Sequence, residues 1–435
     1  MTNAPKKRKS LKADTEGRLI RAYKYRIYPN AEQKTLLAKH FGAHRFVFNA
    51  CLDKAIHEYE ESKKRVDFLE LRNKFVRYEL SEDNPWLKEE IYAHALNQTV
   101  VKDLSAAFTN FFKRRSEGVG FPKFKSRKDN YQSFGIPVGC KGFTDDQRYV
   151  KVPKKCGGLI RVRAHRPLPD GTIKTCRVSR TPSNRYYISI TVDEGTALPP
   201  VQAFDDENVL GIDLGLTHFA TLSTGEKIDM PKFLQQSLIR KQVLSRRVSR
   251  KKRGSKNRQK ARLRLAKLDE RIANQRNHVQ HEVSRLIIDN CENQAIAVET
   301  LNIKGMIKNR HLSRHIADVA WASFVAKLEY KARWAGKRVI KIDRWAPSSK
   351  RCSICGYKKE EMPLHIREWQ CPECRTIHDR DVNAARNIRQ YALEEYYSGG
   401  NTAGEPVDSL PLGRGMNQEP SVSGCIQMET SFYPV

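Results

Sequence analysis

The sequence predicts a multidomain α+β protein, and three observations lead to that prediction. The chain has 435 residues, enough for about three domains of ordinary size. Segments in which apolar and polar residues alternate, as in strands, flank a long segment with apolar residues three and four positions apart, as in helices. Strand and helix patterns then alternate through the second half of the chain.

The charge of the chain indicates a polyanionic partner. It has 80 lysines and arginines against 49 aspartates and glutamates, a formal net charge of +31. Such a surplus points first to nucleic acid, with an acidic protein or an anionic membrane surface as the alternatives. No apolar run is long enough to span a membrane, and the N-terminal MTNAPKKRK lacks the apolar segment of a secretory signal. We expect an intracellular protein, cytoplasmic or on the nucleoid in a prokaryote and nuclear in a eukaryote.

The first half of the chain predicts a small sheet with a helical block inserted in it. Residues 1–17 are polar and basic and are expected to be disordered. Residues 18–30 contain a strand pattern, RLIRAYKYRIY, and residues 31–118 have helical spacing. Residues 119–203 are rich in glycine, proline and β-branched residues, which predicts a small antiparallel sheet or barrel. The strand at 18–30 is expected to join that sheet.

Apolar spacing predicts the core of the helical block. A strict four-residue step joins the residues that should share one helix face: Leu96, Val100, Leu104 and Phe108. We also interpret the cluster of Phe108, Phe111 and Phe112 as core, with phosphate binding by the adjoining basic residues 113–115 as the alternative.

Residues 204–397 predict a second unit in which strands and helices alternate. The expected strands lie in residues 209–226, 293–299 and 337–343, and the expected helices in residues 232–290, 316–335 and 382–397. Residues 398–435 lack periodicity and are expected to form a disordered tail.

The long helical segment combines an apolar stripe with a basic face. A near-heptad stripe predicts pairing with another helix: Leu265, Leu268, Ile272, Val279, Val283 and Leu286. Between residues 240 and 276 there are 16 lysines and arginines against Asp269 and Glu270 alone. A charge run is usually a solvated face, but this imbalance would be self-repelling without a polyanion, so we expect contact with phosphate.

Four of the ten cysteines predict a zinc site. They form two CxxC pairs separated by 15 residues, Cys352 with Cys355 and Cys371 with Cys374, a spacing typical of a zinc ribbon. Four protein ligands leave Zn²⁺ no open position, so the metal is expected to be structural. Redox pairs or coincidence are the alternatives. The remaining cysteines stand singly and are interpreted as inert buried thiols: Cys51, Cys140, Cys156, Cys176, Cys291 and Cys425.

Three carboxylates lie in or beside predicted regular structure. Asp213 lies in the strand pattern GIDLGL, Glu299 ends the apolar run AIAV, and Asp381 lies in HDRDVNAA at the start of a helix. A carboxylate in such a place is unfavourable unless it binds a cation or a hydrogen-bond donor. Each acid alone is more often a cap or part of an ion pair. Together they suggest one shared Mg²⁺ site of the kind used in phosphoryl hydrolysis.

Four segments resemble the successive motifs of TnpB proteins, which are transposon-encoded relatives of the type V CRISPR effectors. They are GIDLGLTHFATLSTGE, AVETLNIKGM, SSKRCSICG and HDRDVNAARNI, in the order of that family. The resemblance covers most of residues 209–397, and RAYKYRIYP near the N-terminus is similar to the family's first strand. The helical block and the middle sheet agree with the family in order and type only.

The resemblance implies an RNase H-like RuvC nuclease domain over residues 204–397, with a zinc ribbon at about 347–378 inserted before the third acid. It also implies a split wedge barrel, formed by residues 18–30 and 119–203, with an inserted recognition block at 31–118. Asp213, Glu299 and Asp381 would be the catalytic acids and would hold two Mg²⁺, with Mn²⁺ as the alternative. Asp379 is interpreted as a supporting or capping residue.

The implied partners are a guide RNA transcribed from the transposon end and double-stranded target DNA beside a short recognition motif. Target choice would come from base pairing with the guide. We expect a monomer with no membrane contact and no small-molecule substrate. Lys350 and Arg351, beside the first cysteine pair, are interpreted either as guides for the DNA strand or as solvated charges.

Three other functions remain as alternatives. A nuclease-inactive RNA-guided repressor would be expected to have lost one of the acids. A transposase with an RNase H-like core would not need the zinc ribbon between the second and third acids. A plain RNA-binding or architectural protein would explain the charge and the zinc but not the carboxylates.

Overall fold

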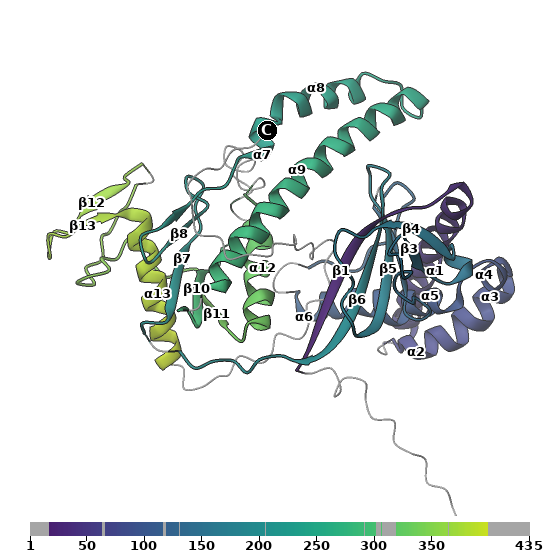
Figure 1. Ribbon diagram of the computed structural model, residues 1–435, viewed down its shortest axis with the longest axis horizontal. Coiled ribbons are helices and arrows are strands. Elements are labelled where there is room, and N and C mark those ends of the chain that lie inside the picture. The colour runs from purple at the N-terminus through teal and green to yellow at the C-terminus, as the bar shows by residue number, and fades with distance from the viewer. Residues whose placement is uncertain are drawn as a thin grey trace, which may run out of the picture.

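The computed structural model describes residues 17–398 apart from 63–65, 116–118, 130, 205, 291, 302–305, 307–318 and 364. The expected disorder of residues 1–16 and 399–435 and the single thiols Cys291 and Cys425 lie outside that part. Within it, two large sheets, their helices and a small two-stranded ribbon make up the fold (Figure 1). None of the described helices is both long and apolar enough to cross a bilayer.

The N-terminal strand lies inside a six-stranded antiparallel sheet of order β2-β5-β6-β1-β4-β3. The bounds are β1 (Arg18–Tyr28), β2 (Gln132–Ile136), β3 (Tyr149–Lys151), β4 (Leu159–Arg163), β5 (Thr172–Arg180) and β6 (Tyr186–Ala197). Because β1 pairs with β6 and β4, the predicted strand and its place in the sheet are confirmed. The outer strands β2 and β3 are not paired with each other among the described residues, so hydrogen bonds do not close a barrel.

The helices between β1 and β2 pack on one face of this sheet. They are α1 (Ala31–Ser62), α2 (Phe68–Glu70), α3 (Leu80–Asp83), α4 (Trp86–Glu89), α5 (Ala93–Gln98) and α6 (Ser105–Lys113), with π-helical segments at Leu71–Glu79 and Thr99–Leu104. The predicted four-residue stripe is buried throughout. The interpretation of the phenylalanine cluster as core is right for Phe108 but wrong for Phe112, whose side chain is 63% exposed.

The second sheet is mixed, with order β11-β10-β7-β8-β9. Its bounds are β7 (Val209–Asp213), β8 (Ala220–Leu222), β9 (Lys227–Ile228), β10 (Ala295–Glu299) and β11 (Arg338–Ile342). The neighbouring strands β11, β10 and β7 run parallel to one another, whereas β8 and β9 are added in antiparallel pairs. Strands buried on both faces read as continuous apolar runs, which is why 209–212 and 295–298 are apolar throughout.

Helices cover both faces of the second sheet. On one face, Leu210 and Ile212 pack against α9 (Lys256–Asp289) and α12 (Trp321–Trp334). On the other face, Val209 and Ala297 pack against α13 (Arg380–Ser398). Alternate residues of a strand point to opposite faces, so the odd-numbered residues of β7 and β10 point toward α13.

The contact between α13 and β7 depends on Gly211. A Cβ atom built on this residue would lie 2.0 Å from the carbonyl oxygen of Ala385 and 2.9 Å from the amide nitrogen of Arg389. Both neighbours belong to the helix backbone, which cannot turn away as a flexible side chain could. Glycine therefore permits an approach of helix to strand that no other residue allows.

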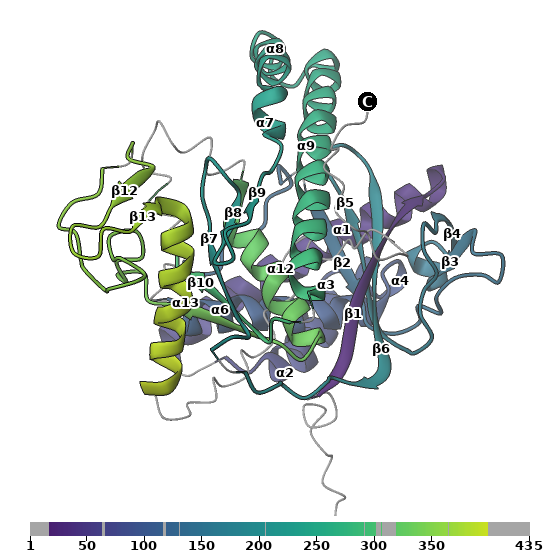
Figure 2. The same ribbon diagram turned by 60° about the vertical axis from the view of Figure 1, so that its left-hand side comes forward.

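The helices α7 (Phe233–Gln236), α8 (Leu238–Ser249) and α9 follow β9, and α8 and α9 form a hairpin that projects from the body of the molecule in both views (Figures 1 and 2). The predicted helix pairing is confirmed by the packing of α9 on α8 and α12. Leu268, Ile272 and Val283 of the predicted stripe are buried, but Leu286 is 43% exposed and does not belong to it. Near the end of α9 the buried positions are Ile287 and Ile288, which pack in the same core as α12.

A single carboxylate joins the six-stranded sheet to the long helix. Glu270 of α9 accepts hydrogen bonds from the Ser183 hydroxyl at 2.6 Å and the Tyr187 hydroxyl at 3.0 Å. It also pairs with Arg185 at 2.9 Å. One of the two acids in the basic helical segment thus serves as an anchor between the two halves of the fold.

A buried lysine lies between α9 and α12. The Nζ of Lys327, whose side chain is 1% exposed, donates to Ser323 Oγ at 2.7 Å and Gln280 Oε1 at 3.0 Å. Burial, then repulsion from Lys331 and Arg276, lowers the pKa of Lys327 to about 8. The amine is held by neutral acceptors and therefore loses its proton more easily than a lysine in water.

This lysine predicts a pH dependence of stability. Because the folded pKa of about 8 lies below the ordinary lysine value of 10.5, the unfolded chain binds more protons between these pH values. The free energy of unfolding therefore rises with pH across that window. In Lys327→Met this contribution to the slope is expected to vanish, as measured by urea unfolding at a series of pH values. An unchanged slope in the variant would show that Lys327 does not have this lowered pKa in the folded protein.

Gly211→Ala is expected to lower the free energy of unfolding by about 1–3 kcal/mol or more, because the new methyl group meets helix backbone. Gly42→Ala in α1 is the matched control, since its Cβ would meet no atom within 4 Å. Alanine is expected to be neutral or stabilising there. Thermal unfolding of both variants measures the difference, and equal effects would show that α13 does not approach β7 so closely.

Candidate metal and nucleic-acid site

Two of the three predicted acids end neighbouring parallel strands. Ile212 pairs with Val298, so Asp213 and Glu299, the next residues of β7 and β10, lie side by side where both strands end. Adjacent strands are about 4.8 Å apart. Both residues share the parity of the positions that pack against α13. Their side chains therefore point to the same face, toward that helix.

The third acid reaches the same place from the helix. Asp381 is the second residue of α13, and its side chain is 19% exposed. Asp379 Oδ1 accepts hydrogen bonds from the amides of Asp381 and Val382 at 3.1 and 3.0 Å. Asp379 also pairs with Lys227 Nζ of β9 at 2.6 Å. It therefore caps the helix and ties its first turn to the sheet, which is one of the two roles expected for it.

The ionisation of Asp213 is affected by the charges of the other two carboxylates. Burial, then the charges of Glu299 and Asp381, raises the pKa of Asp213 to about 7. Burial also raises the pKa of Glu299. Although burial opposes ionisation of Asp379, its bonds to Lys227 and to backbone amides lower the pKa of that carboxyl group. A cluster in which negative charges oppose one another is one that a bound cation would stabilise.

The donor set suits a hard divalent cation, because carboxylate oxygens are the ligands that Mg²⁺ prefers. The carboxylate oxygens are less tightly gathered than the cysteine sulfurs described below, since in the described part of the chain only the sulfurs form a metal-ligand group within 4.8 Å. Arg367 lies beside the acids. It approaches Asp381 Oδ1 at 3.5 Å and donates to Thr217 Oγ1 at 3.1 Å.

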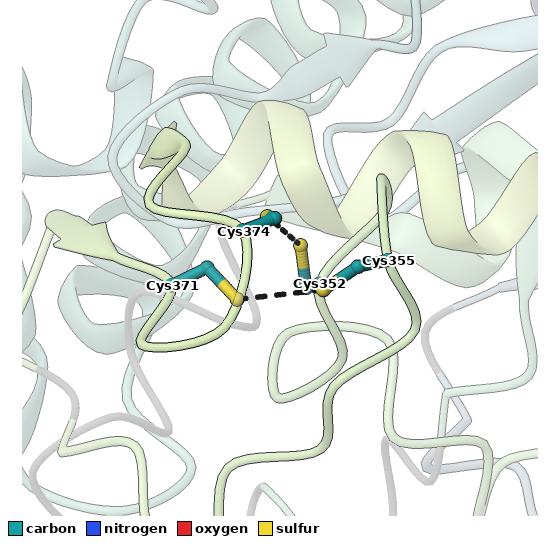
Figure 3. A group of neighbouring side chains, drawn as sticks. All are labelled: Cys352, Cys355, Cys371 and Cys374. Carbon is teal, nitrogen blue, oxygen red and sulfur yellow. Dashed lines mark hydrogen bonds between the residues drawn. The ribbon is translucent and has the colours of Figure 1, made fainter.

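The four predicted zinc ligands come together from two segments: Cys352 and Cys355 lie between β11 and β12 (Glu368–Gln370), and Cys371 and Cys374 lie in the turn that joins β12 to β13 (Ile377–Asp379). All four sulfurs lie within 4.8 Å of one another, and Figure 3 shows the pairs Cys352–Cys374 at 3.6 Å and Cys355–Cys371 at 3.5 Å. Thiolates 2.3 Å from a tetrahedral zinc are about 3.8 Å apart. The cluster therefore fits Zn²⁺ with all four positions taken by protein.

His378 supports this cluster, and the sequence pattern did not reveal it. Its Nε2 lies 3.0 Å from Cys352 Sγ, and its side chain is buried. A hydrogen bond to a ligating thiolate orients it and spreads its charge. Burial, then the charge of Arg386, lowers the pKa of His378, which favours the neutral ring that donates one N–H.

Two buried asparagines attach the cysteine cluster to α13. Asn383 accepts from the amide of Ser353 at 3.0 Å and donates to the carbonyl of Arg351 at 2.7 Å. Asn387, one turn later, donates to the carbonyls of Ser348 and Arg351 at 2.7 and 2.6 Å. Because both lie close to Asp381, the first cysteine pair and the third acid are held by the same helix.

The sequence contained a signal for these asparagines but not for Arg367. Asn383 and Asn387 are four positions apart, beside two alanines, and lie on the buried face of the helix. Polar side chains in such a place must find hydrogen-bond partners.

The two basic residues beside the first cysteine pair have partners within the protein. Lys350 donates to the carbonyl of Glu360 at 2.8 Å, and Arg351 pairs with Glu394 at 3.3 Å. Neither is therefore a free solvated charge.

The basic hairpin carries a shallow pocket near its tip. Five cationic side chains line it: Arg247, Arg250, Lys251, Lys260 and Arg264. A concave surface of this charge is suited to phosphate groups. Phosphate contact by the hairpin remains a prediction.

Three family models match the chain. A family described as "Probable transposase" (OrfB_IS605) matches residues 189–310, a "Cas12f1-like, TNB domain" matches residues 321–388, and a "Helix-turn-helix domain" matches residues 19–64. In the described part of that last range the chain forms β1 and the single long helix α1. The first two matches together contain the strands of the second sheet, the three acids and the four clustered cysteines.

Two curated relatives match over nearly the whole chain, and a third matches over about half of it. A protein of Streptomyces pristinaespiralis named "Putative RNA-guided DNA endonuclease" is 35% identical over 92% of this chain and 96% of its own. The "Putative RNA-guided DNA endonuclease InsQ" of Escherichia coli is 29% identical over 92% of this chain and 98% of its own. A "CRISPR-associated endodeoxyribonuclease Cas12f1" of Sulfoacidibacillus thermotolerans is 30% identical over 47% of this chain and 50% of its own.

Cys371→Ser is expected to lower the zinc content of the purified protein from about one atom per chain to near zero, because structural zinc needs all four thiolates. Loss of the metal should also loosen the start of α13, visible as faster proteolysis between 347 and 381. Cys140→Ser, a half-buried thiol outside the cluster, is the matched control and should retain zinc. Retention of zinc by both variants would show that the cluster holds no metal.

Proposed function

This chain belongs to the TnpB family, and on that premise we propose that it is an RNA-guided DNA endonuclease that hydrolyses phosphodiester bonds of target DNA. The observation that carries the proposal is the meeting of Asp213, Glu299 and Asp381 on one face of the second sheet, together with 35% identity to a curated relative of that name. A binding protein would have no need of such a cluster.

The second sheet and its helices form the nuclease unit, an RNase H-like RuvC domain over residues 204–397. Three parallel strands flanked by antiparallel strands, with helices on both faces, support this assignment. The cysteine cluster at about 347–378 is its zinc ribbon, with a structural metal. Through Asn383 and Asn387 the ribbon fixes the helix that carries Asp381.

Asp213, Glu299 and Asp381 would hold two Mg²⁺ ions, or Mn²⁺, which activate water and stabilise the leaving 3′ oxygen when bound. The chain itself supplies the position of the three carboxylates. The raised pKa of Asp213, about 7, marks a group that is poorly ionised without a cation. Asp379 holds the first turn of α13 in place by its cap and its ion pair with Lys227. Both contacts of Asp379 lie within the protein, so neither of them depends on the base sequence of the nucleic acid.

The first half of the chain binds the guide RNA and the heteroduplex. The strand at 18–30 and residues 119–203 form the wedge, and residues 31–118 form the recognition block. Contacts to phosphate and to helix shape suit a chain of net charge +31. The guide comes from the transposon end, and the target carries a short adjacent motif. Sequence choice then lies in base pairing, while cutting requires only phosphate chemistry.

The alternative of a nuclease-inactive RNA-guided repressor is less well supported, because it does not require the three acids that this chain retains. A transposase with the same core would act without a guide. One experiment distinguishes both alternatives from the proposal, because each predicts a different result.

The protein is co-expressed with the DNA that flanks its gene, and the purified RNA complex is tested in Mg²⁺ on plasmids with a fixed target and randomised flanks. Asp213→Ala is expected to lower cutting by about a thousandfold, since several kcal/mol of transition-state stabilisation depend on the metals. Bound RNA should remain unchanged. Glu292→Ala removes an exposed acid just before β10, at the opposite end of that strand from Glu299; this variant is the control and should cut normally.

Cutting that requires guide, flank and Asp213 supports the nuclease. Bound RNA and target without cutting by the wild-type complex would support the repressor instead. Cutting or strand transfer without a guide would support a transposase. Absence of both RNA and cutting would contradict the proposed function.

A further inference from the structure

An exposed tryptophan lies near the end of β11, at the edge of the sheet where the acids are. The side chain of Trp345 is 77% exposed, the highest value for any aromatic residue in the described part of the chain. Tryptophan is normally well buried, because its large apolar surface is costly to leave in water. Tryptophan is enriched at binding interfaces, where its large flat surface is covered, so we take Trp345 as a candidate contact for a ligand.

The position of Trp345 follows from the strand register. Ile342 ends β11 and pairs with Glu299, which in turn lies beside Asp213. Trp345 is three residues further, a distance of at most about 11 Å along the chain. It therefore stands on the same edge of the sheet as the carboxylates, two strands away from Asp213.

The backbone that presents Trp345 is held in place. Asp343 Oδ1 accepts a hydrogen bond from the amide of Trp345 at 2.9 Å, and the amide of Asp343 donates to Glu395 of α13 at 3.2 Å. The next residue, Ala346, packs against the apolar cluster beneath α13. The tryptophan is thus aimed outward by a fixed turn, which reduces the conformational entropy lost when a ligand covers it.

A cation accompanies the ring. The guanidinium carbon of Arg344 lies 4.7 Å from the centroid of the Trp345 ring, and Arg344 is itself exposed. An aromatic face together with an arginine is the combination that binds single-stranded nucleic acid: the ring stacks on a base, and the cation meets the phosphate. A base inside a duplex cannot reach such a ring, so the ligand is an unpaired nucleotide.

We propose that Trp345 and Arg344 form a stacking platform for one unpaired base of the DNA strand that enters the carboxylate site. The inference rests on the proposed function, because it takes its occupant from the strand to be cut. Stacking there would hold the strand on one side of the acids. Asp343 is bonded to Glu395, which lies about 21 Å along α13 from Asp381, so the stacked base is several nucleotides away from the scissile phosphate. Trp345 is accordingly a positioning residue for the strand.

The test uses the RNA-bound complex and targets that carry a single abasic nucleotide at successive positions around the cut site. With the wild-type protein, one or two positions are expected to slow cutting by about tenfold, because the platform finds no base. Trp345→Ala should slow the cutting of intact DNA by about 5- to 150-fold, the range for loss of one base–aromatic stack. In that variant the abasic positions should cause no further loss.

Trp345→Phe, which keeps an aromatic face, should recover most of the rate. Tyr397→Ala removes another exposed aromatic side chain, 61% exposed and near the end of α13, and should leave the abasic profile unchanged. Because Trp345 is so exposed, neither of its two variants should change the thermal unfolding midpoint. An unchanged rate for Trp345→Ala, or an abasic penalty that persists in it, would overturn the proposal. So would a penalty that follows abasic positions in the guide RNA instead.

Failure of the proposed function looks different, since the wild-type complex would then not cut at all. Quenching of tryptophan fluorescence by single-stranded DNA tests the platform independently of cutting. Quenching that is lost in Trp345→Ala supports the platform, and equal quenching in both proteins overturns it.

Discussion

The close approach of α13 to β7 at Gly211 is the constraint on which the rest of the candidate site depends. Asp213 follows Gly211 by two residues on the same face of the strand, so it points at the helix that glycine admits. The same helix begins with Asp381. A larger residue at position 211 would push the helix away and separate the two acids. The packing of α13 on β7 therefore determines the distance between Asp213 and Asp381.

The cysteine cluster adds a second constraint on the same helix. Zinc held by four thiolates would fix the loop that contains Arg351 and Ser353, and Asn383 and Asn387 attach that loop to α13. Asp379 and Lys227 connect the first turn to the sheet. The result is a helix start held from two sides. This rigidity suits a cluster of like charges, which would otherwise relax apart until a cation joins them.

Much of this fold could be predicted from the sequence because its strands and helices obey simple periodicities. The pattern of residues 18–28 predicts β1 with its observed bounds, and the four-residue step of the helical block is buried as expected. The predictions failed where a local pattern cannot report its surroundings: Leu286 continues an apolar stripe but has no neighbour to cover it, and Phe112 turns outward beside a buried Phe108. The acids and cysteines of the candidate site could be singled out from the sequence. Arg367 was missed because the pairing of β12 with β13 places it beside Asp381. Trp345 was missed because only the register of β11 places it at the edge of the sheet where β7 and β10 end.

Target cutting by the RNA-bound complex, measured as a function of Mg²⁺ concentration for the wild-type protein and for Glu299→Gln, tests the carboxylate cluster directly. The wild-type complex should not cut when Mg²⁺ is left out, and its cutting should saturate as Mg²⁺ is added. The variant, with one charged ligand fewer, should need much more Mg²⁺ or fail to cut at any concentration. Cutting without a divalent cation, or the same Mg²⁺ dependence in both complexes, would contradict the assignment of the carboxylate cluster as the catalytic metal site.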